Sequence, residues 1–483
     1  MSFVSELEPK PLWKHFDEIL AIPRPSTREE AMRRYVLELA GRKGLRHRQD
    51  SKGNIVVEKP ASPGKESAPA VVLQGHLDMV TEKNADVTHD FDRDPIKPRE
   101  EDGWVKATGT TLGSDNGIGV AAILAVMEAD DLVHGPLELL FTVDEETGLT
   151  GAVGLEADAI AIRGRRLLNL DTEEEYTVTI GCAGGSLTRI LLPEQHAGVR
   201  PGSAVFDLKL SGLKGGHSGL EIHLQRGNAV QLLARAIHAA GEVHLGGFQG
   251  GNKHNALARE ASARVILPPD RKAAFRQAVE KEIAAIREEY RPVEPELSFE
   301  ISEGTAERVW TEDLGRRVLL LLNTLPHGVL AMSHAIKDLV ETSVNLAAVT
   351  SAGNEVVVLL STRSSIGTAM SATRRRLRAA AGLVGARVEE NEGYPAWTPN
   401  LESPLLRRFQ EVHERVQGSE PELKAVHAGL ECGVIGEKFP GMDMISFGPV
   451  IEGAHSPDER VKIDSVGRFY KLLTELLADL ARG

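Results

Sequence analysis

Residues 71–78 read VVLQGHLD, a short apolar run that ends in a histidine and an aspartate. An uninterrupted run of this kind is typical of a strand buried on both faces of a parallel sheet. LELLFTV (137–143) and LLNL (167–170) have the same character, and helix-like segments lie between the three runs. Strands that alternate with helices predict a parallel sheet covered by helices on both faces. We therefore expect an α/β fold.

Each of these three runs is followed by side chains that bind divalent metals. His76 and Asp78 close the first run, Glu145 and Glu146 follow the second, and Asp171 follows the third. A single aspartate after a strand is usually a turn or capping residue. Three strands that all end in this way favour a shared site, because the carboxyl ends of parallel strands meet in one crevice.

Two further residues of the same chemistry come from distant parts of the chain. Asp115 lies in the glycine-rich turn GSDNGIG (113–119), and His455 lies in GPVIEGAHSPDE (448–459). Histidine and carboxylate ligands suit two divalent metals. Ligands so far apart in sequence exclude a local metal finger, so the sequence predicts a two-metal site at the mouth of a large α/β enzyme.

The spacing of these residues suggests separate roles. Residues i and i+2 of a strand point to the same side, so His76 and Asp78 should enter the crevice together. Asp78 can then hold the imidazole ring of His76 in place or hold neighbouring ligands. The adjacent carboxylates of Glu145 and Glu146 should point in different directions, which leaves one to bind metal and the other to act as a base. Asp115 is free to bridge two ions.

A chain of 483 residues is longer than one core usually supports, so two domains are expected. Near residue 185 the pattern changes to alternating strands such as AVFDLKLSG (204–212). We predict a discontinuous catalytic domain, 1–186 and 393–483, built on a mostly parallel mixed sheet with helices on both faces. Residues 187–392 should form an inserted α+β lid domain.

The expected lid contains a βαββαβ unit and an approximate second copy of it. Helices are predicted over 225–240, 271–290 and 314–322, and VNLAAVTSAGNEVVVLLST (344–362) reads as a β-hairpin. The sequence contains no internal repeat strong enough to prove a duplication.

Composition narrows the function class. Apolar residues make up 41% and charged residues 26%, which is ordinary for a globular protein, and the net charge of −14 argues against nucleic acid or anionic membrane as partner. The two cysteines, Cys182 and Cys432, exclude a disulfide framework and indicate a reducing compartment.

The N-terminal segment is acidic where a signal peptide would be basic, and no run of about 18 apolar residues occurs. We expect a cytoplasmic protein.

Seven motifs together resemble the co-catalytic zinc metallopeptidases related to carboxypeptidase G. The resemblance covers essentially the whole chain and is closest to the aminoacylhistidine dipeptidases, also called peptidase D or cytosol non-specific dipeptidases. The motifs are HLDMV (76–80), GSDNGIG (113–119), DEETGLTGA (144–152), NLDTEE (169–174), GGHSG (215–219), HAGLECG (427–433) and GAHSPDE (453–459). The family carries glutamate at the position of Asp171 in many carboxypeptidases and deacylases, so aspartate here resembles the aminopeptidase and dipeptidase branch.

The resemblance implies two divalent metals per chain, with Zn²⁺ as the first choice and Mn²⁺ or Co²⁺ as alternatives that the same ligands accept. It assigns His76 and Asp171 to one metal, Glu146 and His455 to the other, Asp115 as the bridge, and Asp78 and Glu145 as the catalytic pair. It also implies a cis peptide bond between Asp115 and Asn116.

Lid residues are expected to bind the substrate. The resemblance implies that His217 reaches the substrate carbonyl, from the same chain or from a dimer partner. The guanidinium of Arg363 suits the free carboxylate of a dipeptide, although a surface arginine would look the same in sequence. Asn255 is a further candidate for the carbonyl or carboxylate, and His427 and Glu431 are expected near the substrate or behind the ligands.

The sequence therefore predicts a metal-dependent hydrolase of unblocked dipeptides with broad specificity that includes Xaa-His. A metal-activated water would attack the peptide carbonyl, with Glu145 as general base. A related N-acyl amino acid deacylase and a non-catalytic binding protein are the alternatives. A monomer and a homodimer formed through the lid both remain open.

Overall fold

The computed structural model describes residues 2–482, which divide into two compact units. Residues 2–182, 397–425 and 430–482 form the first unit. The second unit comprises Ala183–Ala396 and a short return of the chain at Val426–Gly429. The inserted segment thus starts before the expected residue 187 and ends after the expected residue 392.

The first unit is built on an eight-stranded mixed sheet. Its strands lie in the order β1 (Arg46–Gln49), β2 (Ile55–Lys59), β6 (Leu137–Thr142), β3 (Val71–His76), β7 (Arg166–Asn169), β21 (Asp443–Ser446), β8 (Thr177–Cys182) and β20 (Glu422–Val426). The four central strands from β6 to β21 are parallel, whereas β1 and β2 are antiparallel to each other, β2 is antiparallel to β6, and β8 is antiparallel to β21. The predicted fold class is confirmed.

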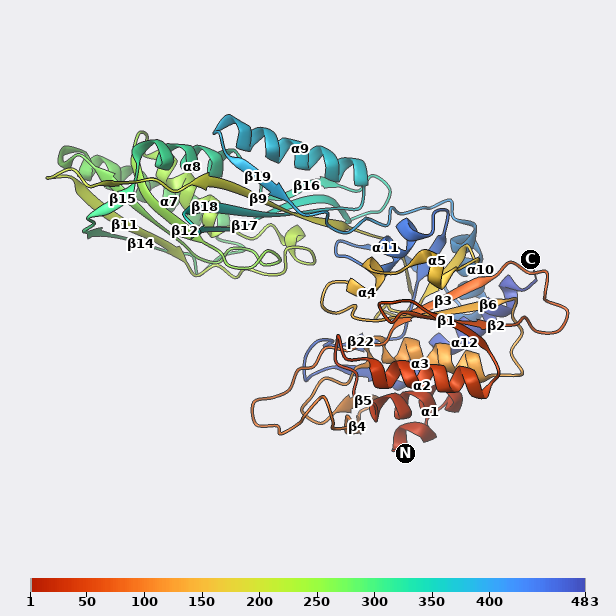
Figure 1. The fold of residues 1–483 in the computed structure, drawn as a ribbon. Helices are drawn as coiled ribbons and strands as arrows, with labels where there is room; N and C mark the ends of the chain where they lie inside the picture. Colours follow the sequence, from red (N-terminus) through yellow and green to blue (C-terminus); the bar gives the residue numbers. More distant parts are fainter. Residues whose placement is uncertain (1, 483) are drawn as a thin grey trace. The chain divides into compact units, whose positions relative to one another are not determined.

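Strands β3 and β6 are fully buried, which explains their continuous apolar sequence. Every residue of β3 and β6 is buried because helices cover both faces of the sheet. α1, α2 and α3 lie on one side, and α4, α5 and α11 lie on the other (Figure 1). The helices of this unit are α1 (Lys10–Leu20), α2 (Glu30–Arg42), α3 (Ser114–Glu128), α4 (Thr150–Val153), α5 (Ala157–Ile160), α10 (Pro404–Gln417), α11 (Glu431–Lys438) and α12 (Ile463–Leu480).

A small antiparallel sheet brings the C-terminal part of the chain to residues 98–107. Its order is β22 (Ile451–Glu452), β23 (Arg460–Lys462), β5 (Trp104–Ala107) and β4 (Pro98–Glu101). The loop between β22 and β23 carries His455. These four strands are not apparent in the sequence, because two to four residues are too few to show a periodic pattern.

The second unit contains a nine-stranded sheet with four helices. Eight strands follow the order β14 (Ser298–Gly304), β11 (Ala204–Ser211), β13 (Ala261–Leu267), β12 (His244–Gly250), β17 (Val340–Ala352), β18 (Glu355–Ser364), β9 (Gly184–Pro193) and β19 (Arg387–Glu390), and β16 (Gly328–Met332) pairs with β17. The helices are α6 (Ala229–Ala239), α7 (Lys272–Tyr290), α8 (Glu312–Thr324) and α9 (Gly367–Leu383).

The strand order supports two copies of one unit. If β11, β12, β13 and β14 are strands 1 to 4 of the first copy, their spatial order from the edge of the sheet to its centre is 4-1-3-2. β9, β17, β18 and β19 give the same order from the opposite edge. The first strand of the second copy, β9, therefore precedes the whole first copy in sequence, and the sequence pattern did not predict it.

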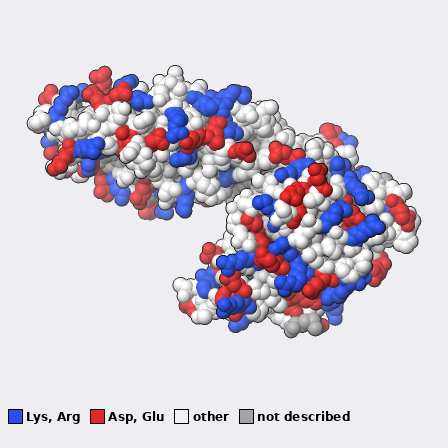
Figure 2. All heavy atoms as spheres, viewed as in Figure 1, with Lys and Arg blue, Asp and Glu red and all other residues white. Residues whose placement is uncertain are grey.

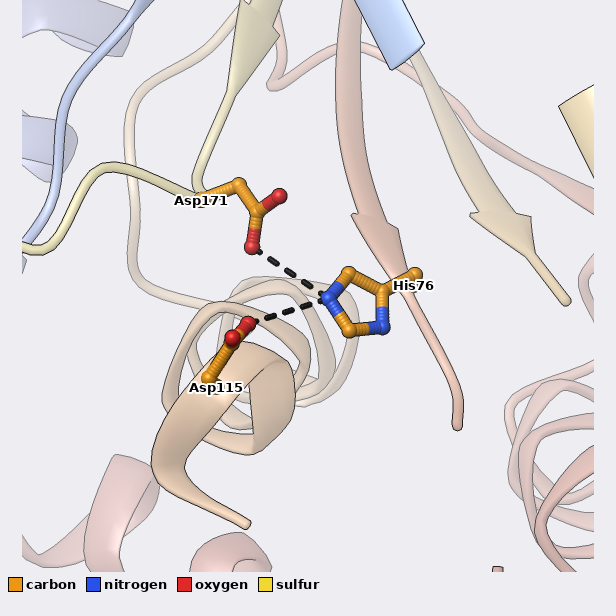
Figure 3. Close-up of side chains that lie close together, drawn as sticks. All are labelled: His76, Asp115 and Asp171. Carbon is orange, nitrogen blue, oxygen red and sulfur yellow. Dashed lines mark hydrogen bonds and ion pairs between the residues drawn. The ribbon is translucent and has the colours of Figure 1, made fainter. Parts of the chain in front are cut away.

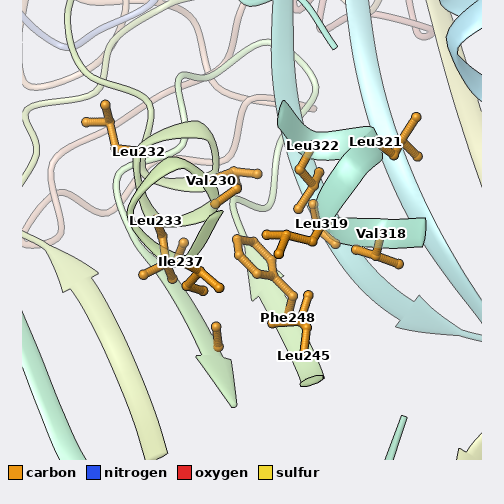
Figure 4. Close-up of a cluster of buried hydrophobic side chains, with 14 of the residues drawn as sticks. Val230, Leu232, Leu233, Ile237, Leu245, Phe248, Val318, Leu319, Leu321 and Leu322 are labelled. Atoms are coloured by element: carbon orange, nitrogen blue, oxygen red, sulfur yellow. The ribbon is translucent and has the colours of Figure 1, made fainter. Parts of the chain in front are cut away.

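The core of the second unit lies between the sheet and its helices. Leu245 and Phe248 of β12 lie between apolar side chains of α6 and α8 (Figure 4). Both side chains are almost completely buried. Helix α6 starts at Ala229, later than the predicted residue 225, because the side chain of Asn228 caps it by accepting a hydrogen bond from the amide of Gln231.

Surface charge is mixed in both units. Acidic and basic side chains are interspersed over the visible face of each unit (Figure 2). Among residues 2–482, every helix is too short or too polar to cross a membrane.

Candidate metal centre and active site

Strand and helix ends of the first unit supply most of the predicted site residues. His76 is the last residue of β3, Glu145 and Glu146 follow β6, and Asp171 follows β7. Asp115 lies in the first turn of α3. The structure brings these residues together with His455.

The first group of three consists of His76, Asp115 and Asp171 (Figure 3). Nε2 of His76 lies 3.1 Å from Oδ1 of Asp115 and 3.4 Å from Oδ1 of Asp171. In Figure 3 both carboxylates point toward the same ring nitrogen. The three side chains could therefore share one cation.

The second group consists of Asp115, Glu146 and His455. Nε2 of His455 lies 3.1 Å from Oδ2 of Asp115 and 3.0 Å from Oε2 of Glu146. Asp115 thus gives one oxygen to each group, which is the geometry that a bridging carboxylate needs.

The spacing of these atoms fits metal coordination. Ligand atoms about 2.0–2.1 Å from a tetrahedral ion lie about 3.3 Å from one another. The four nitrogen–oxygen separations lie between 3.0 and 3.4 Å. Oε1 of Glu146 and Oδ1 of Asp171 are buried and make no hydrogen bond, although buried carboxylate oxygens normally have a partner. Divalent cations would satisfy both atoms.

The charges of the site also favour a cation. Burial would lower the pKa of His76, but the carboxylates of Asp171 and Asp115 hold it well above its ordinary value. Hydrogen bonds to Asp115 and Glu146 raise the pKa of His455 to about 11. Burial, together with the neighbouring carboxylates, raises the pKa of Asp171 to about 6. Protons on these groups compensate the crowded negative charge, and metal ions would replace them.

Asp78 holds both His76 and the loop after β6. Its Oδ1 lies 3.2 Å from Nδ1 of His76, so the ring presents Nε2 to the first group, as the i, i+2 spacing predicts. The amides of Glu145 and Glu146 donate to Oδ1 and Oδ2 of Asp78 at 3.0 and 3.2 Å. Despite burial, these bonds lower the pKa of Asp78 to about 2. Asp78 therefore stays ionised as an acceptor.

The peptide bond between Asp115 and Asn116 is cis, as the resemblance implies.

Glu145 also lies within reach of the ligands. Geometry alone would allow it to bind metal, because His76, Glu145 and Glu146 form a third group with ligand atoms close together. Burial raises the pKa of Glu145 well above its ordinary value. A raised pKa makes the carboxylate a stronger proton acceptor, which suits a general base.

Glu431 lies beneath the site in the first unit. It is the first residue of α11 and is buried, and its Oε2 accepts hydrogen bonds from Gln74 at 2.6 Å and Thr142 at 2.7 Å. Gln74 precedes His76 by two residues on β3, so Glu431 lies under the ligand-bearing strand end.

The other four candidates belong to the second unit, and three of them meet around Gly219. A Cβ atom on Gly219 would lie 2.7 Å from the carbonyl oxygen of His427, 3.1 Å from Cε1 of His217 and 3.3 Å from Cζ of Arg363. The sequence marks Gly219 only as the last residue of the GGHSG motif, and its role in leaving room for these groups is visible only in the fold. Asn255 is near them, because its carbonyl accepts the amide of Ser218 at 2.8 Å.

Hydrogen bonds fix the orientation of these side chains. Nδ1 of His217 accepts the amides of Gly219 and Leu220 at 3.2 and 3.1 Å, so a neutral ring carries its proton on Nε2. Burial, with Arg363 nearby, lowers the pKa of His217 and favours the neutral form. Nε2 of His427 lies 2.8 Å from the hydroxyl of Ser343.

Arg363 is buried at the end of β18 and is therefore not a surface arginine. It donates from Nη1 to the hydroxyl of Tyr394 at 2.8 Å, while its buried Nε makes no hydrogen bond. An anionic ligand would satisfy Nε. The sequence did not indicate Tyr394, because a lone tyrosine in a loop carries no recognisable pattern.

Comparison with known proteins agrees with this geometry. Residues 72–479 match the family described as Peptidase family M20/M25/M40. The chain is 41% identical over 484 residues to the cytosol non-specific dipeptidase of Escherichia coli (strain K12), with 99% of each chain covered. It is also similar to the crystal structure of aminoacylhistidine dipeptidase from Vibrio alginolyticus, with 42% identity, a TM-score of 0.92, and coverage of 99% of this chain and 98% of the other.

A more distant structure shares the fold alone. The aminopeptidase PepT of Bacillus cereus ATCC 10987 is 16% identical, with a TM-score of 0.58 and coverage of 98% and 99% of the two chains. The family match and the near-complete coverage at 41% identity lead to one conclusion. The chain belongs to Peptidase family M20/M25/M40.

Proposed function

We propose that this protein hydrolyses unblocked dipeptides, with broad specificity that includes Xaa-His. The observation that carries the proposal is Asp115, which gives one oxygen to each of two ligand groups with Glu145 beside them. The names of the Escherichia coli and Vibrio alginolyticus relatives support dipeptides as the substrate class.

The proposed cofactor is a pair of divalent metals, with Zn²⁺ first and Mn²⁺ or Co²⁺ as alternatives. The residues that would hold them are His76, Asp115, Glu146, Asp171 and His455. Metals bound here would polarise the substrate carbonyl and lower the pKa of the attacking water.

The chain itself supplies the proton transfers. The carboxylate of Glu145 accepts the proton of the attacking water and then delivers it to the leaving nitrogen. Asp78 keeps the ring of His76 oriented through its bond to Nδ1. His217 donates its Nε2 proton to the substrate carbonyl oxygen, where negative charge develops.

Substrate length would be set by charges at the two ends of the dipeptide. The guanidinium of Arg363, with Asn255 and His427 close by, binds the free carboxylate. Asp171 and Glu173 favour the free amine. Glu174 is less suited to this role, because it is exposed and forms an ion pair with Lys424.

A panel of dipeptides tests the proposal. Free dipeptides should be cleaved when metal is present, whereas N-acetylated and C-amidated forms should be cleaved poorly. The variant Arg363→Ala should lose the discrimination against the amide, because it removes the group that recognises the carboxylate. Rapid release of N-acyl groups with no dipeptide cleavage would instead indicate a deacylase.

Two further expectations remain proposals. We propose a cytoplasmic location, which the name of the Escherichia coli relative supports. We also propose that the second unit, near 187–392, acts as a lid and that a homodimer would form through it. Gel filtration with light scattering would measure the oligomeric state.

A further inference from the structure

The carboxylate of Glu459 holds the turn that presents Asp115. Glu459 is only 2% exposed, and its two oxygens accept every amide of the turn from Leu112 to Asp115. Oε2 accepts the amides of Leu112 at 2.7 Å and Gly113 at 2.9 Å. Oε1 accepts the amide of Ser114 at 2.7 Å, its hydroxyl at 2.6 Å and the amide of Asp115 at 3.3 Å.

Arg24 holds the same turn from its carbonyl side. This buried guanidinium donates from Nη2 to the carbonyl oxygen of Gly113. It also donates from Nη1 to the carbonyl oxygens of Leu77 at 3.0 Å and Asp78 at 2.6 Å. The turn is therefore fixed to the end of β3 as well as to Glu459.

Glu459 also anchors the loop that carries His455. His455 has a φ of 63°, a left-handed conformation that costs a non-glycine residue energy unless neighbouring contacts hold it. The amide of Glu459 donates to the carbonyl oxygen of Ser456 at 3.1 Å, which closes the loop directly after His455. The side chain of Glu459 thus connects the loop of His455 to the turn of Asp115. His455 and Asp115 contact each other, although they are 340 residues apart in sequence.

We propose that Glu459 is a positioning residue that sets the metal affinity of the site by fixing Asp115 relative to His455. Asp115 projects from the start of α3 toward His76 (Figure 3), so a shift of this turn would displace one oxygen from each ligand group. This inference rests on the proposed metal centre.

The chemistry of the contact explains why a carboxylate is required. The first amides of a helix have no partner within the helix, and its N-terminus favours negative charge. The four amides that face Glu459 can only donate, and the two carboxylate oxygens can only accept. A glutamine would direct its NH₂ group at amides of the turn and would lose one set of bonds. Glu459→Gln therefore changes the contact without changing the size of the side chain.

A helix cap that only stabilises the fold is the competing explanation, and Glu138 supplies the matched control. Its carboxylate is 5% exposed and accepts the amides of Arg163 at 3.0 Å and Gly164 at 2.7 Å. Glu138 lies near the start of β6, at the opposite end of that strand from Glu145. Glu138→Gln should weaken the fold in the same way but leave the ligands in place.

The experiment titrates metal-free protein with Zn²⁺ in competition with a chelating indicator. The unaltered chain is titrated first, and failure to bind two Zn²⁺ ions would reject the metal centre itself, before any variant is compared. Glu459→Gln should bind Zn²⁺ about 10- to 100-fold more weakly than the unaltered chain, the usual effect of losing a residue that orients ligands. Glu138→Gln should keep the original affinity even if both variants lose a similar amount of thermal stability.

Ser114→Ala provides a milder variant if Glu459→Gln does not fold. It removes only the hydroxyl that donates to Glu459, and it should weaken Zn²⁺ binding by a smaller factor. Unchanged affinity in every Glu459 or Ser114 variant that folds would overturn the proposal. Equal losses in Glu459→Gln and Glu138→Gln would also overturn it, because the effect would then be one of general stability.

Discussion

At the scale of the residue, the two adjacent glutamates after β6 have different proposed tasks. Glu145→Ala should keep both metals and lower kcat at least about 100-fold, because a positioned general base is lost. Glu146→Ala should lose a metal, since its Oε2 lies 3.0 Å from Nε2 of His455. Elemental analysis of each purified variant, together with steady-state kinetics, measures both effects.

The opposite pattern has a clear meaning. If Glu145→Ala loses a metal and Glu146→Ala keeps two, the ligand and the base must be exchanged. The third ligand group, which contains both glutamates with His76, makes this a real alternative.

His217 is expected to act mainly in the transition state. The bonds at Nδ1 direct its Nε2 proton outward, so His217→Ala should lower kcat by about 10²–10³-fold and change KM less. His223→Ala, an exposed histidine of the same unit, is the control and should behave like the unaltered protein. Near-normal kcat in His217→Ala would show that this histidine is a loop residue without a catalytic role.

At the scale of the element, the GGHSG loop depends on a glycine. The absent side chain of Gly219 leaves space among His217, Arg363 and the carbonyl oxygen of His427. Gly219→Ala should displace these groups and lower kcat/KM by about 10- to 100-fold, because misplacement of about 1 Å is already costly to catalysis.

A glycine with open space around it provides the control for this loop. A Cβ atom added to Gly367 would meet no heavy atom within 4 Å, so Gly367→Ala should leave kcat/KM unchanged. If Gly219→Ala keeps full activity, the loop either relaxes freely or does not bind substrate, and a crystal structure of the variant would separate these outcomes.

At the scale of the whole molecule, metal should link activity to stability. Removal of metal by a strong chelator should abolish dipeptide hydrolysis, and Zn²⁺, Mn²⁺ or Co²⁺ should restore it. Because metal binds the folded state, free metal at about 100-fold its Kd should stabilise the protein by about 2.7 kcal/mol for each site that it fills. Calorimetry with and without metal measures the change in Tm. Full activity in protein proven metal-free would refute the proposed mechanism.

Local sequence patterns were sufficient to predict much of this architecture. Buried strands such as VVLQGH and amphipathic helices such as α7 and α8 are visible because burial imposes a regular apolar pattern on consecutive residues. The strand ends then located His76 and Asp171, because parallel strands place their carboxyl ends at one edge of a sheet.

The sequence by itself therefore determined the α/β class and indicated the residues that the structure brings together at the strand ends. Only the tertiary structure decided which backbone groups hold that set in place. Glu459 and Arg24 bind amides and carbonyls, which every residue possesses, so no side-chain pattern marks their partners. The pairing of β9 with β18 could not be predicted from the sequence either, because pairing between distant strands depends on the assembled sheet and not on either segment alone.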